Sequence, residues 1–411
     1  MHGLPANYWR LWGASAVSNL ADGVFFILLP LLAVRLTDSP LLVAGLAIAA
    51  RLPWLVFVLV AGALADRLDR RVTMRNVQLF RTAMLIGLTV LAVTDLLSLP
   101  VLYLTAFALG VAETMFDTAA QSILPSIVDK EKLAGANGRL YGVELVMQQF
   151  IGPPLGGLVI GLSVPLALGG SAVGYALAAL GLTLIVGSFR PTRSGPPTRL
   201  TADIAEGLRY LWRHRVLRTL AFMVGGINMA AVATQAVFVL YAVRPGPMGL
   251  SEPAFGVLLV TFAVGSLIGS AVAAPLERRF GRVRVLFASV LVTAMSFAVP
   301  AFTTSAFVIG GVFVLSGVFV VVWNVITVTL RQRIVPDQLL GRVNAAYRLF
   351  AWGTQPIGAL VGGLIGESLG LRAVFIFGGV LALTLFLARL VITEEALAQA
   401  EADAEAAAAA A

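Results

Sequence analysis

Three ionisable residues, Asp22, Arg51 and Glu113, lie deep inside long apolar stretches of the sequence. Each is about a dozen residues from one end of its stretch, which corresponds to roughly 18 Å along a helix and so to the middle of a membrane. Charged side chains at this depth are costly and normally face a partner or a water-filled cavity. The three residues are therefore candidates for a buried charged site.

One arginine cannot neutralise two carboxylates, and a surplus acid in a low dielectric favours its protonated form, as a proton carrier must. Asp117 lies one helical turn from Glu113, and its charge strengthens that tendency. We therefore predict that Glu113 is the main proton carrier and that Asp22 pairs with Arg51. The reverse assignment of the two acids and a purely structural ion pair are the alternatives.

Other polar residues in the apolar stretches are weaker candidates. Glu144 lies near the start of its stretch, where it is either a gate residue or a side chain that reaches back to the membrane surface. Any one of the uncharged residues is as well explained by a hydrogen bond between helices as by contact with a cargo. These candidates for a cargo cavity are Asn19, Gln148, Gln149, Asn228, Gln235, Trp323, Asn324 and Gln355.

The composition identifies the element that must position these residues as the transmembrane helix. Of the 411 residues, 59% are hydrophobic and 12% charged, against about 25% charged in soluble domains. At about 20 residues per crossing, the apolar runs predict twelve spans, the third of them over residues 76–97. We expect an all-α membrane protein of two six-helix bundles.

Several classes of chemistry are disfavoured. The chain has no cysteine, which excludes disulfides and thiolate metal sites. His2 and His214 are far apart, and neither Lys130 nor Lys132 follows a phosphate-loop pattern. We therefore expect no enzyme activity, no metal, no cofactor and no nucleotide.

Positive charge is distributed asymmetrically along the chain. Of the 29 lysines and arginines, only Arg35, Arg244 and Arg372 fall in loops on the side away from the amino terminus, and Arg51 lies within a span. Cytoplasmic loops carry the excess of positive charge in membrane proteins. The net charge of +8 therefore reports sidedness rather than nucleic-acid binding, and both termini are predicted to be cytoplasmic.

Internal repeats divide the chain into two halves. The segment 121–125 returns as 332–336, the glycines of 152–157 return in 358–363, and the basic turn 66–71 is answered by 278–282. Features recurring in the same order indicate a duplication of six spans. The predicted domains are a bundle over 1–190, a cytosolic linker over 191–216, a bundle over 217–392 and an acidic, alanine-rich tail over 393–411.

The linker and the tail have distinct compositions. Leu200, Ile204, Leu208, Leu211 and Trp212 recur at helical spacing among arginines, which predicts an amphipathic helix on the cytosolic membrane surface that tethers the bundles. The tail is rich in glutamate and alanine, which indicates a solvated helix or disorder.

Two motifs resemble those of the major facilitator superfamily. The segment 62–71 resembles its loop motif, and 152–157 resembles its antiporter motif, although Asp69 and Gln148 replace expected glycines. Over residues 8–392 the chain is most similar to the bacterial enterobactin-exporter and macrolide-efflux group, through residues 18–23, 113–117 and the arginine-rich central helix. The motif residues are Gly62, Asp66, Arg67, Arg70 and Arg71 of the loop, and Gly152, Pro153, Gly156 and Gly157 of the antiporter motif.

The resemblance implies a latch and a cavity. Asp66 would lie at the positive end of the eleventh span, Arg70 or Arg71 would pair with Asp117, and the latch would hold the outward-facing state. The resemblance also implies that spans 1, 4, 7 and 10 line the cargo cavity. For the loop charges the alternative is a plain topology signal, and for the glycines it is helix packing.

Together these features predict a monomeric, multi-pass transporter of the bacterial plasma (inner) membrane that works by alternating access. It would export an amphipathic small molecule, such as a drug, siderophore or other natural product, by proton antiport. Its partners would be the cargo, protons and the lipid bilayer. The alternatives are a proton-coupled importer of the same fold and, more remotely, a membrane enzyme or lipid scramblase.

Overall fold

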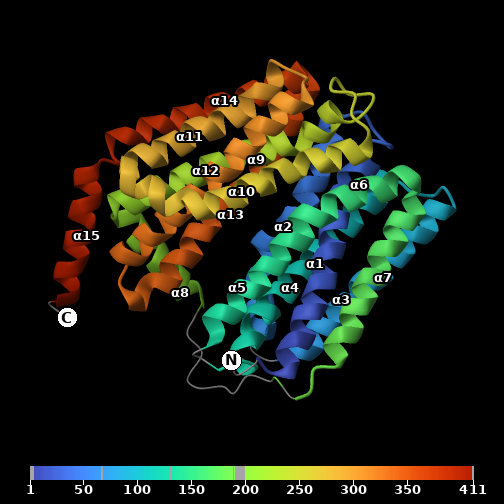
Figure 1. Cartoon of the computed structure of the whole chain (residues 1–411), viewed down its shortest axis with the longest axis horizontal. Coiled ribbons are helices and arrows are strands. Elements are labelled where there is room, and N and C mark those ends of the chain that lie inside the picture. The colour runs from blue at the N-terminus through green and yellow to red at the C-terminus, as the bar shows by residue number, and fades with distance from the viewer. Residues whose placement is uncertain (1–3, 66–67, 130–131, 188, 190–199, 410–411) are drawn as a thin grey trace. The chain divides into compact units, whose positions relative to one another are not determined.

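The computed structural model describes residues 4–65, 68–129, 132–187, 189 and 200–409. Twelve helices among these residues are long and apolar enough to cross a membrane, which confirms the predicted fold class. The described residues form fifteen α-helices, α1 to α15, which Figure 1 labels. Their bounds are α1 Ala6–Ala33, α2 Pro40–Ala65, α3 Arg70–Val93, α4 Leu99–Ile123, α5 Leu133–Glu144, α6 Gly152–Leu162, α7 Val164–Thr183, α8 Leu200–Arg213, α9 Arg215–Ala242, α10 Glu252–Phe280, α11 Arg282–Ala298, α12 Ala306–Ile334, α13 Asp337–Leu369, α14 Leu371–Thr384 and α15 Glu394–Ala409.

The chain divides into two compact units. The first comprises Met1–Ser194 and Val239–Val260, and the second comprises Gly195–Phe238 and Thr261–Ala411. The second unit thus contains most of the segment that the sequence identifies as a linker. Within the first unit, α3 packs against α7 and α4, α1 packs against α6 and α7, and α2 packs against α4.

A change of helix type links α5 and α6. Residues Leu145–Ile151 form one π-helical segment, directly before Gly152 and Pro153. Proline has no N–H to donate and crowds the preceding turn, so an ordinary α-helical ladder cannot run through it, and π-helical turns absorb such an interruption. The segment lies against α1, where a Cβ atom on Gly23 would be 2.5 Å from the carbonyl oxygen of Gln148.

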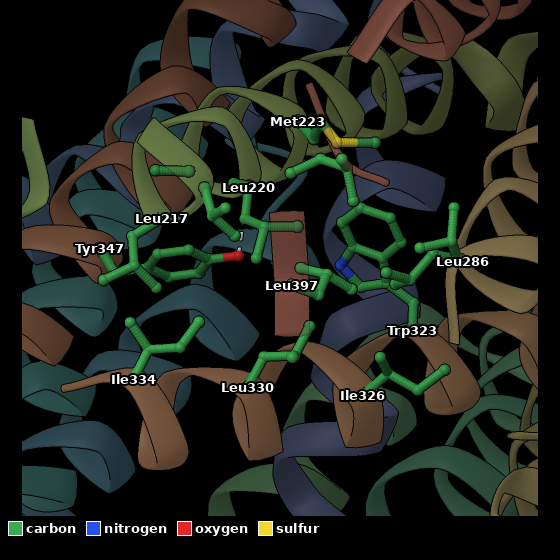
Figure 2. Packing of buried hydrophobic residues seen from close by; sticks show 14 of the residues in the cluster. Leu217, Leu220, Met223, Leu286, Trp323, Ile326, Leu330, Ile334, Tyr347 and Leu397 are labelled. Atoms are coloured by element: carbon green, nitrogen blue, oxygen red, sulfur yellow. Dashed lines mark hydrogen bonds between the residues drawn. The ribbon is translucent and has the colours of Figure 1, made fainter. Parts of the chain in front are cut away.

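The second unit has a hydrophobic core that includes side chains from α9, α11, α12 and α13. Figure 2 shows Leu217 and Leu220 facing Leu330 and Ile334, with Trp323 to the right of them, beside Leu286. Trp323 is 6% exposed. Its large apolar ring fills the core of this unit, and its place at a cargo cavity stays a prediction.

The amphipathic helix α8 packs on protein. It lies against α13, with Leu211 1% exposed, the Tyr210 hydroxyl donating to the carbonyl of Ile334 at 3.2 Å, and Glu206 pairing with Arg342. Part of the apolar stripe therefore contacts protein, including α13, and the predicted contact of this helix with the membrane surface stays a prediction. An amphipathic pattern reports that one face is buried, and both lipid and protein satisfy it.

Candidate functional site

A buried arginine on α3 is at the centre of the charged cluster in the first unit. The side chain of Arg81 is 3% exposed, and its Nη1 lies 3.0 Å from Oδ1 of Asp22 on α1. Its guanidinium lies over the rings of Phe116 and Tyr175, at 5.5 and 5.3 Å from the ring centroids. Cation–π contacts of this kind favour a desolvated guanidinium. Three helices, α3, α4 and α7, therefore enclose one cation that α1 neutralises.

Asp22 accepts further hydrogen bonds from neutral donors. The Tyr175 hydroxyl donates to its Oδ1 at 2.7 Å, and the Ser18 hydroxyl donates to its Oδ2 at 3.4 Å. Gln78 in turn donates to the Ser18 hydroxyl at 2.6 Å. Buried charges are tolerated when they are paired and their lone pairs are satisfied. Asp22 is thus built into the packing of α1, α3 and α7.

Two carboxylates on α4 face the same arginine without pairing with it. Arg81 interacts electrostatically with Glu113 and Asp117, and Arg51 interacts with Glu113. In the part of the chain that the structure describes, no cation lies within 4.0 Å of either α4 carboxylate. Glu144 is exposed and interacts electrostatically with Asp22 and Glu113. The cluster therefore contains more acids than its one closely paired arginine can neutralise.

The structure corrects the predicted partner of Asp22, which is Arg81 and not Arg51. Arg51 is exposed on α2. In the predicted span 76–97 Arg81 would lie close to one end, but α3 begins at Arg70. Arg81 is therefore about 17 Å into the helix at 1.5 Å per residue. The signal available in the sequence was Gln78 and Arg81, one turn apart, with apolar residues on both sides.

The loop motif is described only in part. Asp66 and Arg67 lie outside the described residues, and Gly62 lies within α2. Arg70 donates to the Ser126 hydroxyl at 3.2 Å, and Arg71 donates to the carbonyl of Ile185. The latch between this loop, Asp117 and the eleventh span stays a prediction.

Asp69, which replaces the glycine of the motif, is the N-cap residue of α3. It accepts from the backbone N–H of Val72 at 3.1 Å and of Phe189 at 2.9 Å. Burial opposes ionisation, but these hydrogen bonds and the charge of Arg71 hold the pKa of the Asp69 carboxyl below its usual value. The departure from the motif therefore supplies an N-cap, which is worth about 0.5–2 kcal/mol.

The antiporter-motif glycines bring α6 onto α1. A Cβ atom on Gly152 would lie 2.6 Å from the backbone of Gly23, and one on Gly156 would lie 2.5 Å from the Ile27 side chain. Pro153 and Gly157 are buried in the same helix. The small residues therefore set the distance between the two helices, as in close helix packing in membranes.

The uncharged cavity candidates have mixed surroundings. Asn228 donates to the carbonyl of Ala351 at 2.7 Å, which joins α9 to α13, and Asn19 donates to the carbonyl of Ser15 in its own helix. The remaining candidates are half-buried or exposed: Gln148, Gln149, Gln235, Asn324 and Gln355. Among the described residues, no group of three or more His, Cys, Asp or Glu is arranged to hold a metal ion.

Solved structures share this architecture. The nucleoside transporter NupG matches 94% of this chain and 98% of its own with a TM-score of 0.72 and 12% identity. A bacterial homologue of the iron transporter ferroportin, in an inward-facing state, matches 93% and 98% with a TM-score of 0.67 and 18% identity. At these identities the likeness shows the fold.

Sequence relatives of the chain include two described as exporters. The multidrug efflux pump Tap of Mycolicibacterium fortuitum is 26% identical over 380 residues, which are 88% of this chain and 90% of that protein. The enterobactin exporter EntS of Salmonella typhi is 30% identical over 320 residues, which are 75% and 73% of the two chains. The family model described as a transmembrane secretion effector matches residues 6–410. The chain therefore belongs to this family of major facilitator transporters, and it is a multi-pass membrane transporter and not an enzyme.

Proposed function

We propose that the chain exports an amphipathic small molecule in exchange for protons and that Glu113 carries the proton. The names of the relatives, a multidrug efflux pump and an enterobactin exporter, support a drug, a siderophore or another natural product as the class of cargo. We further propose that the protein works as a monomer in the bacterial inner membrane.

The observation that carries this proposal is the excess of acid around Arg81. Asp22 is held by Arg81, Tyr175 and Ser18, so releasing it would break several contacts at once. Glu113 interacts with Arg81 electrostatically without pairing with it. Protonation of Glu113 therefore changes the charge near Arg81 while the Asp22 contacts stay in place, and this is the property that a coupling residue needs.

Coupling is tested by replacing Glu113 with Gln and assaying purified protein in proteoliposomes. Uphill export driven by an imposed pH gradient should be lost, because a glutamine at this position can no longer bind and release the proton that drives export. Exchange of labelled cargo across a membrane without a gradient should persist, because exchange moves no net proton. Asp129→Asn is the matched control, since Asp129 is an exposed acid outside α4.

Full uphill export by Glu113→Gln would remove Glu113 from the proposal. Asp117→Asn would then be assayed in the same way, because Asp117 interacts with the same arginine. Retention by both variants would leave the α4 acids with a structural role. The sign of proton movement on adding cargo separates antiport from the alternative, a proton-coupled importer.

Topology is a separate prediction. Reporter fusions after Arg75, within residues 190–200 and after Thr393 should all report from the cytoplasm, because the loops at these points carry the positive charge. A fusion after Asp95 should report from the opposite side. An external signal from residues 190–200 would contradict an even number of spans in the first half.

A further inference from the structure

The last helix, α15, is part of the core of the second unit. Leu397 is 1% exposed and Ala400 is 7% exposed, and both belong to the hydrophobic cluster. Figure 2 shows Leu397 among the core side chains, near Trp323 and Leu330. The segment that composition identifies as a solvated tail is therefore a docked helix, which packs against α12.

Acidic residues of α15 meet the basic ends of two long helices. Glu401 makes a two-pronged ion pair with Arg282 at the start of α11, with Nη2 at 3.2 Å from Oε2. Arg333, near the end of α12, lies 3.5 Å from the same carboxylate. Burial opposes ionisation, but Arg282 and then Arg333 hold the pKa of the Glu401 carboxyl below its usual value. One carboxylate thus joins α11, α12 and α15.

A second acid, Glu394, caps the start of α11. Its Oε1 accepts from the backbone N–H of Val283 at 3.1 Å. The residue at the N-cap position is Gly281, which has no side chain to perform this role. The orphan N–H groups of a helix start favour a carboxylate, and here the carboxylate comes from the other end of the unit's sequence.

The first unit also has a carboxylate at the start of its third helix, but there the acid precedes that helix directly in the sequence. There the N-cap residue Asp69 accepts from Val72 in α3 and from Phe189, which follows the sixth membrane helix. In the second unit the acceptor is Glu394, which follows the twelfth membrane helix and accepts from the backbone N–H of Val283 in α11. The basic turns of the two halves therefore both depend on one carboxylate at the start of the third helix of the bundle.

The backbone at the second turn explains why its acid lies elsewhere. Gly281 has φ +83, and a Cβ atom there would lie 2.9 Å from Oε1 of Glu394. A side chain at this position would be strained by the positive φ and would displace Glu394. An aspartate equivalent to Asp69 is therefore incompatible with this turn.

We infer that the basic surface formed by Arg282, Arg333 and the first turn of α11 is an interaction surface whose partner is the chain's own acidic C-terminal helix. Glu394 and Glu401 supply to the second half the charge that Asp69 supplies to the first. Because ionic contacts fasten α15, its docking weakens in salt. This inference concerns the second unit alone and does not depend on the cargo or on proton coupling.

Hydrogen exchange of purified protein without cargo tests the inference. Glu401→Gln should speed exchange of the α15 amides about three- to tenfold, as expected for a partly shielded charged hydrogen bond. Raising NaCl to about 0.5 M should speed exchange of α15 in the unaltered protein and have less effect on the variant. Glu405→Gln is the matched control, because Glu405 is exposed on the same helix.

A second variant makes the test independent of the stability of the first. Glu394→Ala should speed exchange of the Val283 amide selectively, because it removes the acceptor of that N–H. If Glu401→Gln does not fold, this site-specific change and the salt effect on α15 carry the test. Exchange of α15 that is insensitive to salt, or variants that behave like Glu405→Gln, would overturn the inference and leave α15 as an apolar attachment through Leu397.

Discussion

Replacing Arg81 with Met is expected to abolish transport and to lower the free energy of unfolding of the protein by about 3–5 kcal/mol, the cost of breaking a buried ion pair by removing one partner. The Arg81 side chain is 3% exposed and its Nη1 lies 3.0 Å from Oδ1 of Asp22, so the variant leaves a carboxylate without its cation. The Met side chain cannot repeat the contacts with the Phe116 and Tyr175 rings. Thermal unfolding in detergent and export from proteoliposomes measure the two effects.

A double variant separates stability from activity. Arg81→Met combined with Asp22→Asn should recover most of the lost stability, because removing both charges leaves no unpaired ion, but export should stay absent. Arg75→Gln is the control, since Arg75 lies six residues earlier on α3 and donates to its neighbour Asn76. Normal stability and transport in Arg81→Met would show that the pair is dispensable and that the cluster has another organisation.

Replacing Gly152 with Ala is expected to lower the free energy of unfolding by about 1–3 kcal/mol, as overpacking of a close contact does. The added Cβ atom would lie 2.6 Å from the backbone of Gly23, and neither backbone can move aside without separating α6 from α1. Because α1 also carries Asp22, we expect slower transport as well. Unfolding temperature and initial export rate are the measurements.

Gly170→Ala is a control that should raise the free energy of unfolding instead of lowering it. Gly170 lies within α7, and a Cβ atom there would have nothing within 4 Å. Alanine should therefore stabilise that helix by about 0.5–1 kcal/mol. A proton leak in Gly152→Ala without loss of stability would support a role of the motif in preventing leak, whereas loss of stability without leak would support packing.

The sequence by itself determined the membrane-spanning helical fold and the duplication. A bilayer forces each crossing to satisfy its own backbone hydrogen bonds over about 20 apolar residues, so composition and spacing are sufficient to predict twelve helices. The same one-dimensional logic identified Asp22 and Glu113, because a charge in a long apolar run is visible without knowing its neighbours. The motifs of residues 62–71 and 152–157 carried the resemblance to the major facilitator superfamily.

Only the tertiary structure decided which groups meet. By sequence alone, Asp22 could pair with Arg51 or with Arg81. The packing of α3 against α4 and α7 directs Arg81 toward Asp22 on α1. Trp323 is buried in the core, although its sequence context fits a cavity equally well. The composition of the tail predicts a solvated segment because its five acids outnumber its one large apolar residue, Leu397, yet Glu401 meets Arg282 from 119 residues away. Contacts between distant segments depend on the three-dimensional register of helices, and no local pattern in the sequence encodes that register.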